Sequence, residues 1–167
     1  MRSFTERQRF DQPWLWVVLI GVDILVVYQL YNDYQANINQ NSSYLSYALG
    51  IGIITLMTVL IFSIRLETRY DKLGVTYRFF PIMLNHKIIP LNQITSYVVK
   101  DIHPLTSFGG WGYKWSVGKL LLNTHGNYGI VINRKEGQQI TLGTQQPEEI
   151  KEVMRYLFKE DKEEHYG

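Results

Sequence analysis

Sequence patterns predict an α+β protein: an N-terminal membrane helix hairpin, then a small barrel or sandwich of about seven strands capped by a C-terminal helix. Three observations lead to this class. They are two long apolar stretches near the N-terminus, short β-rich runs separated by Gly and Pro, and a final segment with apolar residues at the helical period. The corresponding segments are a hairpin at 1–65, a β-rich domain at 66–158 and a charged tail at 159–167.

The two apolar stretches, about 14–31 and 46–65, are long enough to cross a membrane. About 18 helical residues at about 1.5 Å each span about 27 Å, close to the bilayer core of about 30 Å. Runs such as Val17–Ile20 are apolar on every helical face, whereas a helix in a soluble protein shows one apolar stripe. A cleaved signal peptide is the alternative for the first stretch, and the second stretch favours an uncleaved hairpin.

Basic residues predict the orientation of the hairpin. The sequence contains no Lys or Arg between Arg9 and Arg65, although basic residues flank both outer ends. Because Lys and Arg close to a span favour the cytoplasmic side, we expect both termini in the cytoplasm and the linker 32–46 outside. The predicted location is therefore a cell membrane, with the protein crossing it twice.

Asp23 lies at the centre of the first stretch, where a carboxylate is costly. In an antiparallel hairpin its depth matches that of Thr55 and Thr58 in the second stretch. We expect a hydrogen bond to such a hydroxyl to fix helix pairing, within one chain or with a second copy. The alternative is a proton relay or ion site, for which two helices and one acid offer little.

The segment 66–143 reads as short antiparallel strands with turns between them, such as the one expected at 135–138. A helix then begins at Pro147, with acidic residues in its first turn. Its apolar stripe consists of Ile150, Val153, Met154, Leu157 and Phe158. At this spacing a stripe is typical of a helix that packs on a core, so we expect it to close one end of the domain.

Four segments carry a resemblance to a known family: 71–78, 88–94, 107–114, which contains Gly-Gly-Trp-Gly, and 140–147. Directly after a membrane hairpin, they resemble the bacterial pleckstrin-homology-like domains of small integral membrane proteins, over about residues 66–158. The resemblance implies a bent sandwich or barrel of seven strands capped by the helix, in the bacterial inner membrane. It implies little chemistry, because a fold does not dictate a function.

The sequence does not favour an enzyme. It contains no Cys, which excludes thiol catalysis and Cys metal sites. Its His residues, at positions 86, 103, 125 and 165, lack metal-ligand spacing. Asp101, His103 and Ser107 are the residue types of a catalytic triad, but their closeness on one loop opposes triad geometry. We therefore expect no catalytic residue, no metal site and no cofactor.

One loop is a candidate binding site, together with two nearby lysines: Gly109, Gly110, Trp111, Gly112, Lys114 and Lys119. Consecutive glycines can present backbone N–H groups to an anion, with the lysines close by. Trp111 could instead enter the bilayer interface or a partner's groove. The third interpretation is a tight loop in which Gly permits positive φ and Trp111 packs on the domain.

Charge suggests the classes of partner. Residues 66–143 hold nine Lys/Arg and four Asp/Glu, a net charge of +5, and residues 144–167 hold four and seven, a net charge of −3. A basic domain held at a bilayer would be attracted to anionic lipid head groups. We expect a protein partner or self-association first, anionic lipid second, and a role as accessory subunit of a membrane complex third. No nucleic-acid motif or long basic stripe is present in the sequence.

Overall fold

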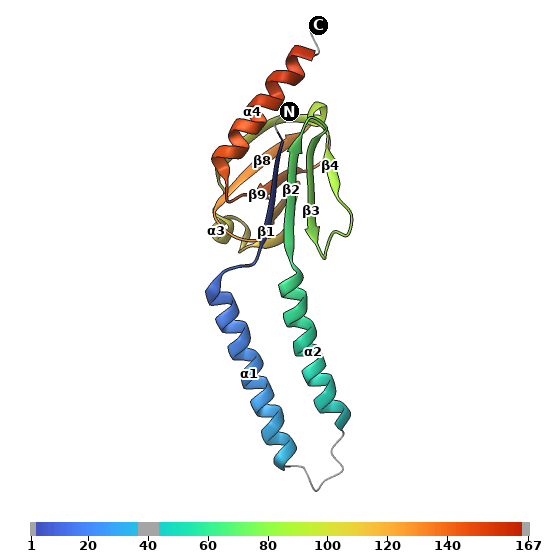
Figure 1. Ribbon diagram of the computed structural model, residues 1–167, viewed down its shortest axis with the longest axis vertical. Helices are drawn as coiled ribbons and strands as arrows, with labels where there is room; N and C mark the ends of the chain where they lie inside the picture. The colour runs from blue at the N-terminus through green and yellow to red at the C-terminus, as the bar shows by residue number, and fades with distance from the viewer. Residues whose placement is uncertain (1–2, 37–43, 165–167) are drawn as a thin grey trace. The chain divides into compact units, whose positions relative to one another are not determined.

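The computed structural model describes residues 3–36 and 44–164, and residues 37–43 of the predicted external linker lie outside that range. The chain forms two compact units, one of Phe10–Ser63 and one that combines the first nine residues with the chain from Ile64 onward. The chain contains the following elements, of which Figure 1 labels the α-helices and several of the strands. In chain order these are β1 (Phe4–Arg9), α1 (Pro13–Ala36), α2 (Tyr44–Ser63), β2 (Arg65–Asp71), β3 (Gly74–Phe80), β4 (Lys87–Ile89), the 3-10 turn η1 (Leu91–Gln93), β5 (Ile94–Asp101), α3 (Pro104–Phe108), β6 (Gly112–Ser116), β7 (Lys119–Asn123), β8 (Tyr128–Arg134), β9 (Gln139–Gly143) and α4 (Pro147–Glu164).

The helices α1 and α2 form the smaller unit, which we call the helix pair. Aromatic rings meet edge to face toward both ends of the pair, Trp16 with Phe62 at 5.8 Å and Tyr34 with Tyr47 at 5.9 Å between centroids. Gly50 lets the two helices approach closely, because a Cβ there would lie 3.3 Å from Leu30 Cδ1. Each helix therefore uses one narrow stripe for its partner.

The remaining faces of the helix pair are apolar and open. None of the described side chains of α1 is buried, and Val17 is 71% exposed. Both helices are long and apolar enough to cross a membrane. Length and composition thus agree with the sequence-based expectation for these two segments.

The larger unit, which we call the sheet domain, contains a four-stranded antiparallel sheet in the order β1-β2-β3-β4. Its first strand lies within the segment 1–65 that the sequence assigned to the hairpin, because Phe4–Arg9 pairs with β2 in this sheet. Residues Phe4, Glu6 and Gln8 face inward and are buried. Two of these three inward residues are polar, so β1 lacks the apolar alternation that marks a half-buried strand.

The second sheet of the domain has five strands in the order β5-β8-β9-β7-β6. The expectation that all strands are antiparallel is wrong here, because β7 and β9 run parallel. The chain reverses direction from β8 to β9, and β9 then lies between β8 and β7, antiparallel to the first and parallel to the second. With β1 and the short β4, the described strands number nine in two open sheets, and no closed barrel forms among the described residues.

One hydrophobic core lies between the two sheets and α4. The predicted stripe of α4 is buried at Ile150, Val153, Met154 and Leu157. The ring of Phe158 packs against that of Tyr97 of β5, with 4.9 Å between centroids and a tilt of 43°. The helix contacts β1 and β2 of one sheet and β5 and β8 of the other (Figure 1). It extends to Glu164, so residues 159–164 of the predicted tail are helical.

Two tight turns depend on a glycine with positive φ. Gly74, with φ 131°, begins β3, where a Cβ would lie 2.1 Å from the carbonyl oxygen of Ile89. Gly137, with φ 89°, lies in the predicted turn between β8 and β9. Both positions need a residue without a side chain to adopt positive φ at low cost.

Candidate functional site

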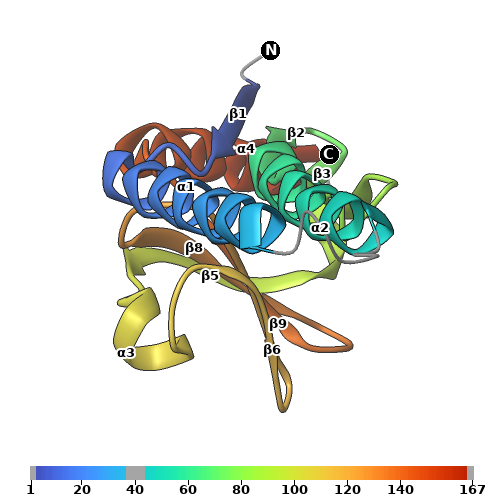
Figure 2. The same ribbon diagram turned by 90° about the horizontal axis from the view of Figure 1, so that it is seen from below.

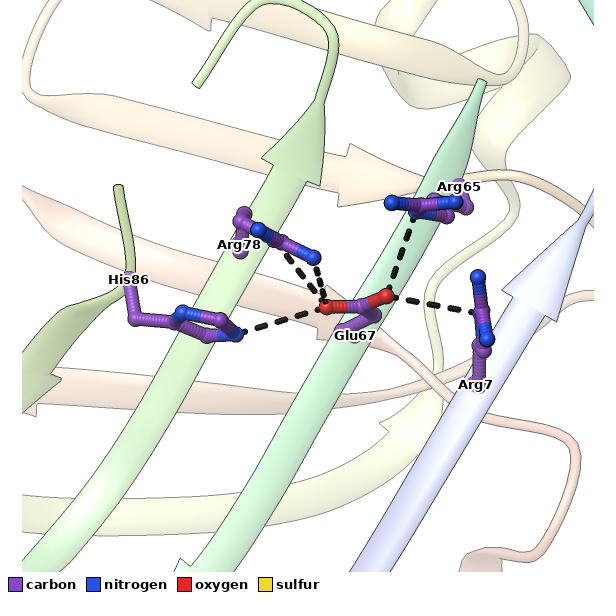
Figure 3. A network of polar contacts seen from close by, with 5 residues as sticks. All are labelled: Arg7, Arg65, Glu67, Arg78 and His86. Atoms are coloured by element: carbon purple, nitrogen blue, oxygen red, sulfur yellow. Dashed lines mark hydrogen bonds and ion pairs between the residues drawn. The ribbon is translucent and has the colours of Figure 1, made fainter. Parts of the chain in front are cut away.

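Three arginine side chains and one histidine surround a single carboxylate on the four-stranded sheet. We call this group, Arg7, Arg65, Arg78 and His86 around Glu67, the arginine cluster (Figure 3). Arg78 donates two hydrogen bonds to Glu67 Oε2, from Nη2 at 2.6 Å and from Nε at 3.0 Å. The other oxygen, Oε1, forms ion pairs with Arg65 Nε at 3.2 Å and Arg7 Nε at 3.4 Å, and His86 Nε2 lies 3.3 Å from Oε2.

The strand register brings these residues together. Glu67 of β2 lies directly across from Arg7 of β1 on one side and from Arg78 of β3 on the other. Arg65 is two residues before Glu67 on the same strand, so both side chains point to the same face. This face is turned away from the core, and we call it the outer face of the four-stranded sheet.

The cluster carries more positive than negative charge. Desolvation is the largest single influence on Glu67 and raises its pKa, but the hydrogen bond and charge of Arg78, with the charges of Arg65 and Arg7, together hold that pKa below 4.5. Glu67 is therefore ionised at neutral pH and balances only one of three guanidinium charges. An excess of guanidinium groups on one face favours contact with carboxylates or phosphates.

A shallow groove extends over the same outer face. It has a volume of about 410 Å³ and is lined by residues that include Thr5, Arg7, Glu67, Arg69, Thr76 and His86. At the other end of the cluster, the guanidinium of Arg65 lies 4.7 Å from the centre of the Phe80 ring. A cation at this distance over an aromatic face is attracted to the ring.

Two backbone N–H groups of the predicted glycine loop form hydrogen bonds within the domain. The N–H groups of Gly109 and Gly110 both donate to the carbonyl oxygen of Pro104 and so cap α3. Gly109, Gly110 and Gly112 have φ values of 70°, 126° and 114°, as the tight-loop interpretation expects. Two of the N–H donors that the anion-binding interpretation needs are therefore already hydrogen-bonded to the protein.

Trp111 is held by the same part of the domain. Its indole N–H donates to the carbonyl oxygen of Gly126 at 3.1 Å, and the Asn123 side chain donates to the same oxygen at 3.1 Å. Trp111 is half-buried. These contacts join the glycine loop to the turn between β7 and β8.

The two candidate lysines lie apart from that hydrogen-bonded loop. Lys114 of β6 is half-buried, whereas Lys119 of β7 is exposed and lines a cavity of about 560 Å³ on the outer face of the five-stranded sheet. Lys100, Asp101 and His103 line the same cavity, and His103 Nδ1 lies 3.3 Å from Asp101 Oδ1. The side chain of Ser107, the third triad-type residue, lies outside the described positions.

The β6–β7 hairpin carries the most exposed of the large apolar side chains described in this sheet. Val117, in the turn, is 92% exposed, and Trp115 is 69% exposed although its indole N–H donates to Gln138 Oε1 at 2.9 Å. The strand β6 forms the edge of the five-stranded sheet, from which the hairpin projects (Figure 2). Exposed Trp and an open strand edge are both features of protein-binding surfaces.

Within the helix pair, the acid predicted to fix helix pairing has one of its expected partners. Thr58 Oγ1 donates to Asp23 Oδ2 at 2.9 Å. Thr55 lines a cavity of about 220 Å³ beside this contact, together with Asp23, Ile54 and Thr58. The hydrogen bond therefore involves the threonine one helical turn further along the chain than Thr55.

The arginine cluster is the feature that the sequence did not predict. Its only local signal is the alternation Arg65-Leu66-Glu67-Thr68-Arg69, which places three charged residues on one face of a strand. Nothing in that alternation identifies Arg7 or Arg78 as neighbours. Among the described residues, no group of His, Cys, Asp and Glu is placed to hold a metal ion.

Comparison with known proteins adds no relative. Neither a protein-family model nor a curated protein matches the sequence. The resemblance to bacterial pleckstrin-homology-like domains therefore stays a prediction that depends on the four sequence segments named above.

Proposed function

We propose that this protein is a membrane-anchored binding module of the bacterial inner membrane. In this proposal α1 and α2 cross the bilayer as a hairpin, and both termini lie in the cytoplasm. The sheet domain is then held at the inner surface, where it binds a partner protein or a second copy of the chain. The expected resemblance to pleckstrin-homology-like domains fits such a role, since it implies a binding fold without catalytic apparatus.

The membrane anchor is supported by length, exposure and charge. At about 1.5 Å per residue, the 24 residues of α1 and the 20 of α2 extend about 36 Å and 30 Å, enough for a bilayer core of about 30 Å. Outward-facing Val and Leu side chains would be costly in water and favourable in lipid. Arg7 and Arg9 before α1, and Arg65 and Arg69 after α2, favour cytoplasmic ends.

The observation that favours a protein partner is the exposed β6–β7 hairpin. Val117 and Trp115 would be left in water on an isolated domain, on a strand whose outer edge can accept another strand. The hydrogen bond from Trp115 to Gln138 holds the ring in place, which lowers the entropy lost on binding.

A photo-crosslinking amino acid at position 117 tests this proposal in native membranes. We expect a crosslinked product of defined mass that contains a protein, either this chain or another one. The same substitution at Glu148, whose side chain is 80% exposed on α4, is the matched control and should give no such product. Equal crosslinking at both positions, or none at position 117, would contradict the proposal.

A second candidate function is contact with anionic lipid head groups, and the arginine cluster favours it. Three guanidinium groups share one carboxylate, and each well-placed basic residue near an anionic surface gains about 1 kcal/mol. The crosslinker at position 9, an exposed residue of the same sheet, distinguishes the candidates. Lipid in its product supports this second function, and protein there contradicts it.

A further inference from the structure

The loop between β3 and β4 carries two exposed apolar side chains that do not pack in the core of the sheet domain. Ile82 is 59% exposed and Leu84 is 69% exposed. Between them, Met83 is buried in the core, and its N–H donates to the carbonyl oxygen of Phe79 at 2.7 Å. The loop is thus fixed at its centre and directs apolar groups outward on both sides of that anchor.

The strand register places this loop at the end of the sheet where the chain leaves for the helices. Phe80, the last residue of β3, pairs with Arg65, the first residue of β2, and Arg65 pairs with Arg9, the last residue of β1. Only Ile64 separates Arg65 from Ser63 at the end of α2. Figure 1 shows the end of β3 and the start of β2 at this same end of the sheet.

Basic residues flank the apolar side chains. His86, the last residue of the loop, and Lys87, the first residue of β4, are both exposed. On the preceding side, Arg65 lies over the ring of Phe80, and Arg78 lies 6.0 Å from the centre of the same ring. Apolar side chains beside basic ones match the chemistry of a bilayer interface with anionic head groups.

We infer that the β3–β4 loop is a second membrane contact, in which Ile82 and Leu84 enter the interface of the bilayer that α1 and α2 cross. This inference relies on the proposed membrane anchor and adds a second membrane contact to it. The basic residues at the base of the loop would contact lipid head groups, while the apolar side chains reach the acyl boundary.

The opposite end of the same strands offers a matched control. Leu73, in the turn between β2 and β3, is 71% exposed, about as much as Leu84. It follows Asp71, the last residue of β2, so it lies about 20 Å from the Arg65 end, at about 3.3 Å per residue. An apolar side chain at this end should remain in water whatever the lipid.

Cysteine labelling of the full-length protein tests the inference, since the sequence has no natural Cys. Leu84→Cys, Leu73→Cys and Leu25→Cys carry an environment-sensitive fluorophore in vesicles of phosphatidylcholine with phosphatidylglycerol and nitroxide-labelled lipid. We expect quenching and a blue shift at position 84 and little change at position 73. Position 25, in the middle of α1, should be quenched. Quenching at position 84 should fall in pure phosphatidylcholine and in an Ile82→Asn background.

The outcomes separate the inference from the proposed anchor. Equal, weak quenching at positions 84 and 73 with strong quenching at position 25 overturns the inference and leaves the anchor standing. A lack of quenching at position 25 overturns the anchor and the inference together. Shielding of position 84 from soluble iodide in native membranes, but not in lipid vesicles, identifies a protein as the partner of this loop and also overturns the inference.

Discussion

The sheet domain buries its apolar side chains in its interior, whereas the helix pair exposes its apolar side chains on its surface. In the sheet domain, residues such as Leu66, Leu122 and Ile140 are completely or almost completely buried between two sheets and α4. In the helix pair, Val17 and Leu25 point outward, and a narrow stripe joins the helices. The buried core of the sheet domain suits water, whereas the exposed apolar faces of the helix pair suit the membrane anchor proposed above.

The difference also changes the role of polar groups. In the sheet domain, buried Glu6 accepts hydrogen bonds from Thr144 Oγ1 and Gln145 N, both at 2.8 Å, and so ties β1 to the loop before α4. In the helix pair, Asp23 accepts one from Thr58. Both carboxyl groups accept a hydrogen bond from a threonine hydroxyl. The first bond lies beside a large hydrophobic core, whereas the second lies in the narrow contact between two helices.

The largest expected contrast concerns truncation of one apolar side chain in each unit. Leu122→Ala leaves a cavity in the core and should lower the free energy of unfolding of the sheet domain by about 2–5 kcal/mol. Val17→Ala removes a side chain that touches no core, and it should change stability by less than about 0.5 kcal/mol. Denaturant unfolding of the full-length protein in a mild detergent measures both. A loss of 2 kcal/mol or more with Val17→Ala would show that this face packs on protein.

The second contrast compares the two carboxylate–hydroxyl pairs by double-mutant cycles. In the sheet domain, Glu6→Ala with Thr144→Val should give a coupling of about 1–3 kcal/mol, because a buried acceptor loses its donor. In the helix pair, Asp23→Asn with Thr58→Val should give about 0.6 kcal/mol and at most about 1.7 kcal/mol. Unfolding in urea measures the first pair, and unfolding in mixed micelles with sodium dodecyl sulfate measures the second. A reversed order would contradict the comparison.

The helix pair was the easier unit to predict because its signals are local. Length and apolar composition mark both helices, and matched depth in an antiparallel hairpin suggests a partner for Asp23. The choice between Thr55 and Thr58 depends on the rotation of α2 about its axis, which composition does not encode. The sequence also predicts the C-terminal helix, since its apolar stripe has the helical period.

The sheet domain was harder because its main features arise from pairing between distant segments. The sequence does not predict β1, because its inward-facing residues Glu6 and Gln8 are polar. Their hydrogen-bond partners, Thr144 and Gly143, follow more than 130 residues later. The arginine cluster needs three strands in one register. A period of two along a single strand gives the face of a residue but not its neighbour across the sheet.

The smallest expected effect is the pH dependence that the arginine cluster adds to the sheet domain. The pKa of Glu67 is lowered by folding, so its stabilising contribution is present above the unfolded value of about 4.5 and is lost as the pH falls through the lower, folded value. Because the cluster lies at the surface, Glu67→Gln should cost only about 0.2–1 kcal/mol at pH 7. This difference in unfolding free energy should shrink below pH 4.5, and about 1 M salt should reduce it at pH 7 by screening. A difference that stays constant from pH 7 to pH 3 would mean that Glu67 stabilises the sheet domain through packing rather than through its charge.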